Sequence, residues 1–129
     1  MPLAIALEKK FGVRSCGFAA SICEDLPGYF LEPHTDTPER LLTGIFYLPE
    51  DDRYRNKRTG TILYKGLYAD HEGIQHSLEA SFTELKEVPY VANSALFFLR
   101  SDWSYHGVRK NAITRRIMSF DLLRWWNAS

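Results

Sequence analysis

Residues 28–49 read GYFLEPHTDTPERLLTGIFYLP, and this segment gives the clearest indication of a β fold. Two short runs rich in aromatic and aliphatic residues, GYFL and LLTGIFYLP, flank a polar segment that contains prolines. Runs of this kind between Pro and Gly residues are typical of β-strands. Within the polar segment, His34 and Asp36 are two positions apart, so on a strand their side chains point to the same face. On its own, this pair also fits a polar strand edge with a turn at Thr37 and Pro38.

The remainder of the chain continues the pattern of short strands. Residues 3–11, LAIALEKKF, predict one short helix that ends at Gly12. A single helix is too little to cover both faces of a parallel sheet, so the pattern predicts an all-β sandwich or barrel. A chain of 129 residues predicts one domain, 1–129, with a core at about 12–124. The predicted strands lie within 13–25, 28–34, 41–49, 60–66, 81–90, 94–100, 104–109 and 114–126.

Composition and charge restrict the partners. Hydrophobic residues make up 45% of the chain and the formal net charge is zero, so we expect neither a nucleic acid nor a membrane as partner. The apolar run at the N-terminus is too short for a signal peptide or a membrane span. Cys16 and Cys23 are expected to be free thiols in a reducing compartment. These observations predict a soluble, cytoplasmic protein.

A third residue turns the His–x–Asp pair into a candidate metal site. Of the four histidines, His71 and His76 lie in a polar loop with acidic neighbours, which favours solvated side chains. His106 lies among aromatic residues in SDWSYHGVRK, directly after the apolar run SALFFLR, so it can be held rigidly. Two histidines and one carboxylate form the facial triad of non-haem Fe(II) oxygenases. Zinc accepts the same ligands, so the triad alone does not name the metal.

Arg115 follows His106 by nine residues, in the run TRRIMSFDLL. Strand alternation places Arg115, Ile117 and Ser119 on one face. A planar guanidinium beside a hydroxyl is a good receptor for a carboxylate, because the fork donates two parallel hydrogen bonds. Tyr47 is a candidate for a further hydroxyl. The alternative is a surface arginine on an edge strand, paired with an acidic residue.

From about Gly28 to Leu123, the chain resembles the Fe(II)- and 2-oxoglutarate-dependent dioxygenases, in particular their prolyl-hydroxylase-like branch. HTD resembles the iron motif of that family, WSYHGV resembles the segment with the distal histidine, and TRRIMSF resembles the strand with the cosubstrate arginine. IFYLP and GTILYK resemble the strands that carry a tyrosine and an aliphatic residue beside 2-oxoglutarate. In this sequence those two residues are Tyr47 and Leu63.

The resemblance implies a double-stranded β-helix, or jelly roll, with a short N-terminal helix. It implies Fe(II) bound by His34, Asp36 and His106, with dioxygen as the oxidant. It also implies hydroxylation of a peptide prolyl residue or a small molecule, with succinate and CO2 as further products. A carboxylate at Asp36 disfavours halogenation, since related halogenases have a small residue there. The residues implied for 2-oxoglutarate are Arg115, Ser119, Tyr47 and Leu63.

Two features depart from the family pattern. Many relatives have a second glycine before the aliphatic strand, where this chain has Thr61. Relatives usually have more helix before the barrel, whereas only residues 3–11 predict helix here. The first departure concerns backbone approach to the cosubstrate, and the second concerns stability and oligomeric state, for which a dimer is one option.

The substrate is open at this level. Peptide prolyl residues, free amino acids, sugars and secondary metabolites are all compatible with the residues, and the loop 50–60 is a candidate lid. The residues that flank the ligand segments are candidate substrate contacts. They are Tyr29, Glu32, Arg100, Trp103 and Tyr105.

Two other classes of protein compete with an oxygenase. One is a non-enzymatic, cupin-like barrel that binds a metal or a small ligand. The other is a zinc-dependent hydrolase, in which Glu32 or Glu39 would act as the general base. Neither class explains Arg115 beside Ser119.

Overall fold

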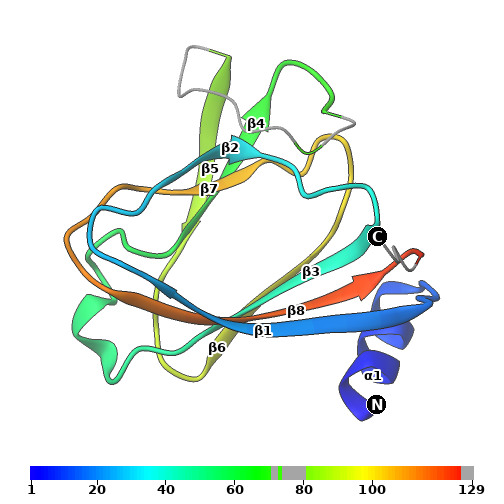
Figure 1. Cartoon of the computed structure of the whole chain (residues 1–129). Helices are drawn as coiled ribbons and strands as arrows, with labels where there is room; N and C mark the ends of the chain where they lie inside the picture. The colour runs from blue at the N-terminus through cyan, green and yellow to red at the C-terminus, as the bar shows by residue number, and fades with distance from the viewer. Residues whose placement is uncertain (71–72, 74–80, 126–129) are drawn as a thin grey trace.

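The computed structural model describes residues 1–70, 73 and 81–125. Eight described strands form two four-stranded antiparallel sheets, with the orders β1-β8-β3-β6 and β2-β7-β4-β5 (Figure 1). This jelly-roll-like arrangement confirms the prediction of a mainly β fold with one short N-terminal helix. The strands are β1 Gly17–Asp25, β2 Leu31–His34, β3 Arg40–Tyr47, β4 Thr61–Gly66, β5 Phe82–Val88, β6 Ser94–Leu99, β7 His106–Val108 and β8 Arg115–Leu123.

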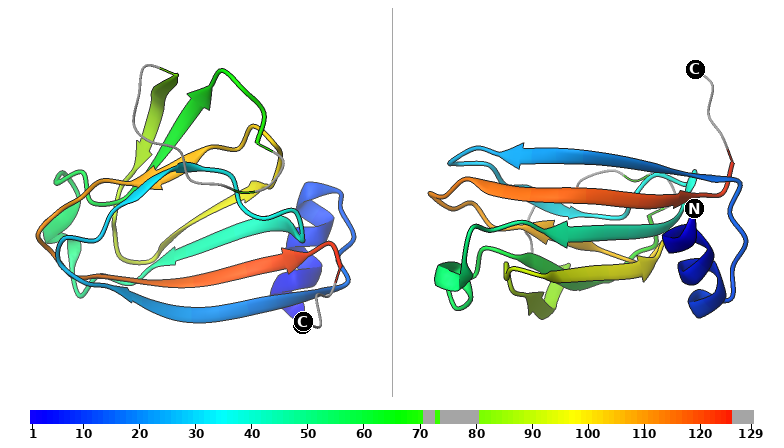
Figure 2. Two further views of the ribbon diagram at one scale, coloured as in Figure 1. Left: turned by 45° about the horizontal axis from the view of Figure 1, so that its top comes forward. Right: turned by 90° about the horizontal axis from the view of Figure 1, so that it is seen from below.

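Helix α1, Pro2–Phe11, covers part of the β1-β8-β3-β6 sheet. Proline suits the first turn of a helix, because the N–H it lacks has no partner within the helix there. The helix ends at Gly12, whose φ of 67° lies in the left-handed region that glycine adopts at little cost. Ala4 and Leu7 pack into a buried cluster with Leu42, Phe120 and Leu122 of the sheet. Figure 2 shows the helix across one end of this sheet.

Strand β8 lies in the interior of its sheet, between β1 and β3. Its side chains alternate between two environments, as expected for a strand. Phe120 and Leu122 belong to the cluster under α1. The side chains on the other face of β8 line a cavity together with residues of the other sheet. They are Arg115, Ile117, Ser119 and Asp121. One strand therefore supplies both hydrophobic packing and a row of site residues.

The loop 50–60 contains a short 3-10 helix, η1, Asp52–Tyr54, which the sequence did not predict. Cys16 and Cys23 are both free thiols, as expected. Within the described ranges, no helix is long and apolar enough to span a membrane. His71 and His76 lie outside the described residues.

Gly60 precedes β4 at a very close approach to β5. A Cβ at this position would overlap the backbone carbonyl oxygen of Val88. Backbone cannot move aside without disturbing the β4–β5 pairing, so we expect Gly60→Ala to lower the unfolding free energy by about 1–3 kcal/mol. Urea denaturation measures the change. Gly17→Ala is the matched control, because nothing lies within 4 Å of a Cβ there. Equal losses in both variants would contradict the prediction.

Candidate metal centre

The two histidines of the candidate triad face each other across two strands. His34 is the last residue of β2 and His106 the first of β7, and their Cα atoms are register partners. Their ring centroids are 4.3 Å apart. Gly107 permits this approach, because a Cβ there would lie 2.5 Å from the carbonyl oxygen of Leu31. Strand β2 therefore places His34 directly opposite His106 of β7.

The donor atoms of the triad converge. The Nε2 atoms of His34 and His106 lie 3.7 and 3.5 Å from Oδ1 of Asp36. One ligand atom from each of the three residues lies within 4.8 Å of the others. The opposite ring nitrogens are 2.9 and 3.0 Å from the backbone oxygens of Glu32 and Ser104. When Nδ1 carries the proton and donates to a carbonyl, Nε2 is left free to bind a metal, as is usual for metal-ligating histidines.

The Asp36 carboxylate is ionised. Burial disfavours the charge, but the neighbouring His106 and His34 side chains outweigh it and hold the pKa of Asp36 far below its usual value. The Thr43 hydroxyl, on β3, donates a further hydrogen bond to Oδ2 of Asp36. One carboxylate oxygen is therefore held by the opposite sheet while the other faces the two imidazoles. An ionised carboxylate beside two imidazole nitrogens suits a divalent cation.

Arg100 holds the segment between His34 and Asp36 in place. Its side chain is only 6% exposed. Nε donates to the backbone oxygen of Asp36 at 2.8 Å, Nη2 donates to that of Asp70 at 3.0 Å, and Nη1 pairs with Asp102 at 2.6 Å. The sequence suggested Arg100 as a substrate contact, whereas in the structure its guanidinium contacts the ligand segment.

Removal of the Arg100 guanidinium takes away the donor to the backbone oxygen of Asp36 and one of two donors to that of Asp70. We therefore expect Arg100→Met to lower the unfolding free energy by about 2 kcal/mol. The affinity for a divalent cation should also fall, because the segment that carries Asp36 loses its support. Urea denaturation and Mn(II) titration measure the two effects. Arg53→Met, which removes an exposed arginine paired with Asp51, is the control and should change neither quantity. A parent-like midpoint and Mn(II) affinity in Arg100→Met would refute the assignment.

The triad opens into a cavity of about 180 Å³ between the two sheets. Arg115 lines this cavity and is only 2% exposed. Its Nη1 donates to Oδ2 of Asp25 on β1 at 2.9 Å, and its guanidinium carbon lies 5.7 Å from the ring centre of Tyr90. Its Nε is buried and has no hydrogen-bond partner among the described residues. Arg115 is therefore paired with an acid, yet it keeps a buried donor.

The other residues suggested for a cosubstrate lie in different places. Ser119 lines the cavity and shares a hydrogen bond of 2.8 Å with Ser21. Tyr47 is buried, and its hydroxyl donates to Thr61 Oγ1 at 2.6 Å. Thr61 is among the residues that line the cavity, whereas Tyr47 and Leu63 are not. Thr61 is the residue that departs from the glycine pattern, and its hydroxyl accepts the hydrogen bond that Tyr47 would otherwise donate to a cosubstrate.

Of the five candidate substrate contacts, Tyr29 alone lines the cavity. Glu32 contributes its backbone oxygen to His34. Trp103 is 55% exposed and lines a shallow groove outside the cavity, with Arg100 and Pro38. Tyr105 is buried, and its hydroxyl donates to the backbone oxygen of Tyr68 at 2.7 Å. Glu32 and Glu39, the suggested bases of a zinc hydrolase, do not line the cavity.

Four polar residues of the cavity escaped the sequence analysis. Strand alternation was a usable signal for Asp121, since it shares the face of Arg115 and Ser119. Burial raises the pKa of Asp121 to about 6, although Arg40 lowers it. No local pattern marks the others, whose neighbours are distant in sequence. The four residues are Asp25, Arg40, Thr43 and Asp121.

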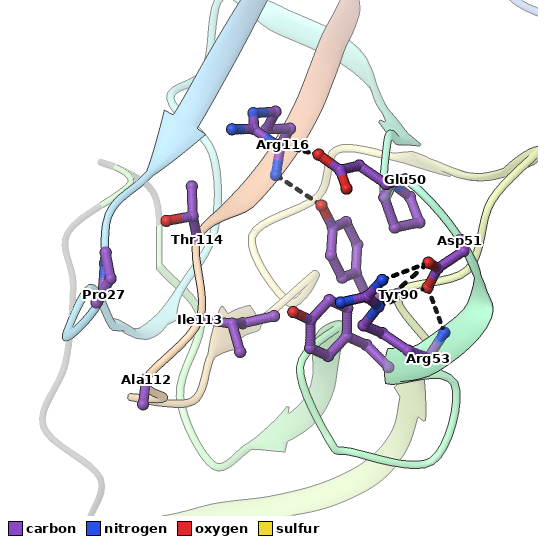
Figure 3. Close-up of a pocket in the computed structure, with 11 residues that line it drawn as sticks. Pro27, Glu50, Asp51, Arg53, Tyr90, Ala112, Ile113, Thr114 and Arg116 are labelled. Atoms are coloured by element: carbon purple, nitrogen blue, oxygen red, sulfur yellow. Dashed lines mark hydrogen bonds and ion pairs between the residues drawn. The ribbon is translucent and has the colours of Figure 1, made fainter.

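A second, larger cavity of about 330 Å³ lies away from the triad (Figure 3). It is lined by part of the loop 50–60, by the loop before β8 and by Tyr90. The Tyr90 hydroxyl accepts a hydrogen bond of 2.8 Å from the backbone N–H of Arg116. Tyr90 separates this cavity from Arg115, because the same ring contacts that guanidinium. The residues of the loop 50–60 do not line the metal cavity, so the structure does not support a lid there.

Comparisons with known proteins support the fold. No protein-family model and no curated protein sequence matches this chain. The crystal structure of a Pseudomonas putida prolyl-4-hydroxylase is similar to it, with a TM-score of 0.63 and 18% sequence identity. The match covers 98% of this chain, which spans about 62% of the length of that structure. At this identity the likeness establishes the fold, a jelly roll of the kind found in a prolyl hydroxylase.

Proposed function

We propose that this chain is a non-haem Fe(II)- and 2-oxoglutarate-dependent oxygenase of the prolyl-hydroxylase-like branch. The observation that carries the proposal is the convergence of His34 Nε2, Asp36 Oδ1 and His106 Nε2 within one 4.8 Å cluster at a cavity. Two imidazoles and one carboxylate leave coordination positions open, as oxygen activation requires. The prolyl-4-hydroxylase fold of the neighbour is consistent with this chemistry.

The residues present fit both groups that such an enzyme uses. His34, Asp36 and His106 would hold Fe(II). Arg115 would hold the distal carboxylate of 2-oxoglutarate, because its buried Nε is a donor without an acceptor in the same cavity. Ser119 lies on the same face of β8 and would add a hydroxyl. When bound, iron and 2-oxoglutarate supply the oxidising chemistry, with succinate and CO2 as products.

The chain's own residues would bind and orient the metal and the cosubstrate and would shield them from water. The low pKa of Asp36 keeps its carboxylate ionised, so metal binding needs no proton release from this residue. Backbone carbonyls hold both imidazoles in one orientation. Thr43 and Arg100 fix Asp36 from two sides, the first through its carboxylate and the second through its backbone. Such support gives a metal site its geometry before the metal arrives.

The Asp25–Arg115 pair leads to a prediction about cosubstrate affinity. The Asp25 carboxylate neutralises part of the guanidinium charge and would repel a second carboxylate beside it. Asp25→Asn keeps the shape but removes the charge, so we expect the dissociation constant for 2-oxoglutarate to fall several-fold. Calorimetry with Mn(II)-loaded protein without oxygen measures it. Glu24→Asn changes an exposed neighbour that pairs with Arg116, and it should have no effect. A weaker affinity in Asp25→Asn would mean that Asp25 mainly orients Arg115.

A turnover assay tests the proposed function. Protein purified without oxygen is mixed with Fe(II), 2-oxoglutarate and air, and succinate is measured, since turnover without substrate is often detectable. We expect succinate from the parent and from Asp51→Ala, which removes an exposed carboxylate far from the cavity. We expect none above background from His34→Ala or Arg115→Ala. Equal succinate in all four proteins would refute the proposal, as would tight Zn(II) binding without affinity for 2-oxoglutarate.

A further inference from the structure

One ion pair of the metal cavity has no part in the function described above. Arg40, the first residue of β3, and Asp121, near the end of β8, both line the cavity. Nη1 of Arg40 lies 2.7 Å from Oδ2 of Asp121. On β8, Asp121 lies six positions beyond Arg115, so along the strand the pair is well removed from the cosubstrate arginine.

Asp121 has an unsatisfied oxygen. The residue is 3% exposed, and its Oδ1 is buried without a hydrogen-bond partner among the described residues. The backbone N–H of Gly44 lies near enough to lower the pKa of Asp121, but no hydrogen bond of ordinary geometry reaches Oδ1, and such an oxygen is costly to bury. If the ion pair served only to hold the two strands together, a hydrogen-bond donor at Oδ1 would make it more stable. A ligand with an N–H or O–H group in the cavity would supply one.

Arg40 is the complementary half of the pair. Its side chain is 36% exposed, and the pair with Asp121 uses only Nη1. Among the described residues, no hydrogen bond occupies the rest of the guanidinium, which can therefore donate to an incoming acceptor. A guanidinium is best matched by a carboxylate, which can accept two parallel hydrogen bonds. The pair thus offers a cation and an anion side by side, with no net charge.

We propose that Arg40 and Asp121 form a subsite for the zwitterionic head group of a free amino acid. The α-carboxylate binds Arg40, and the α-ammonium donates to Oδ1 of Asp121. This proposal rests on the proposed function and names the substrate class of that site. An internal residue of a peptide offers neither charge, because both groups are locked in amide bonds.

The first test measures amino-acid binding alone, in the absence of metal and turnover. Ligand-observed NMR with the metal-free protein uses the proteinogenic L-amino acids as probes, each with its N-acetyl and primary-amide derivatives. We expect at least one free amino acid to bind, and both of its derivatives to bind at least tenfold more weakly. Binding of the derivatives as tight as that of the parent amino acid would overturn the proposal. Absence of binding by every free amino acid would also overturn it.

Variants then assign each charge to its partner. In Arg40→Gln the preference for the acid over the amide should disappear, while Arg40→Lys should keep it in part. In Asp121→Asn the preference for the free amine over the N-acetyl form should disappear. Arg116→Gln and Glu24→Gln alter an exposed ion pair formed by β8 and β1, and both preferences should survive there. Preferences that persist in Arg40→Gln would show an ion pair with a structural role alone.

The inference and the proposed function can fail separately. Succinate formation without amino-acid binding would refute the subsite and leave the oxygenase in place. Amino-acid binding with both preferences, but without succinate, would keep the subsite and refute the oxygenase. If Asp121→Asn does not fold, as judged by its unfolding midpoint, the comparison of Arg40→Gln with Arg40→Lys carries the test of the carboxylate. The same amino acid should increase succinate formation by the parent protein.

Discussion

Asp36→Ala is expected to lower the affinity for a divalent cation by more than about a hundredfold, since loss of a mere supporting contact costs roughly 10–100-fold. The carboxylate is the only charged ligand of the triad and lies within 3.7 Å of both Nε2 atoms. Without it, only the two imidazoles remain as ligands. Mn(II) titration measures the affinity, and 2-oxoglutarate-dependent succinate formation should disappear with it.

Asp51→Ala is the control for this variant. Asp51 is also a carboxylate in contact with a basic residue, Arg53, but it is exposed and lies outside the metal cavity. We expect Asp51→Ala to bind Mn(II) as the parent does. If Asp36→Ala also retained parental affinity, a metal bound by His34, Asp36 and His106 would be refuted.

Arg115→Lys is expected to weaken 2-oxoglutarate binding by about ten- to a hundredfold. Lysine keeps the positive charge but presents a point ammonium instead of a planar fork, so it cannot serve Asp25 and a ligand carboxylate with matched geometry. The loss corresponds to one charged hydrogen bond, about 1.5–3 kcal/mol. Calorimetry with Mn(II)-loaded protein without oxygen measures it, while Mn(II) affinity itself should be unchanged.

Arg116→Lys provides a control at the adjacent position. The Arg116 side chain is 47% exposed and pairs with Glu24 and Glu50 outside the metal cavity. The same chemical change there should leave 2-oxoglutarate affinity as it is. A parent-like dissociation constant in Arg115→Lys would remove Arg115 from the cosubstrate site.

Much of the fold could be predicted, because the information is local. Alternation within residues 114–126 predicted a strand with Arg115, Ile117 and Ser119 on one face, and β8 places all three along the cavity. The helix predicted at residues 3–11 could also be inferred locally, because Gly12 ends it. The observed helix, Pro2–Phe11, begins one residue earlier. The His–x–Asp spacing likewise indicated two donors on one side of the chain.

What could not be predicted depends on pairing between distant strands. Asp25 meets Arg115 because β1 and β8 pair in one register, across 90 residues of sequence. Nothing near Tyr47 indicated that its hydroxyl would be taken up by Thr61 on another sheet. The same holds for Arg100, whose position after a strand suggested an accessible side chain, whereas the fold buries it under Asp36.

The position of β8 also has a consequence for biosynthesis. Among the described strands, β1 pairs with β8 alone, so β1 waits for its partner until the far end of the chain has been translated. At roughly 5–20 residues per second, the 90 residues from Asp25 to Arg115 take about 5–18 s. During that interval a nascent strand with Phe18 and Ile22 has both edges unpaired, and unpaired edges with apolar side chains favour aggregation.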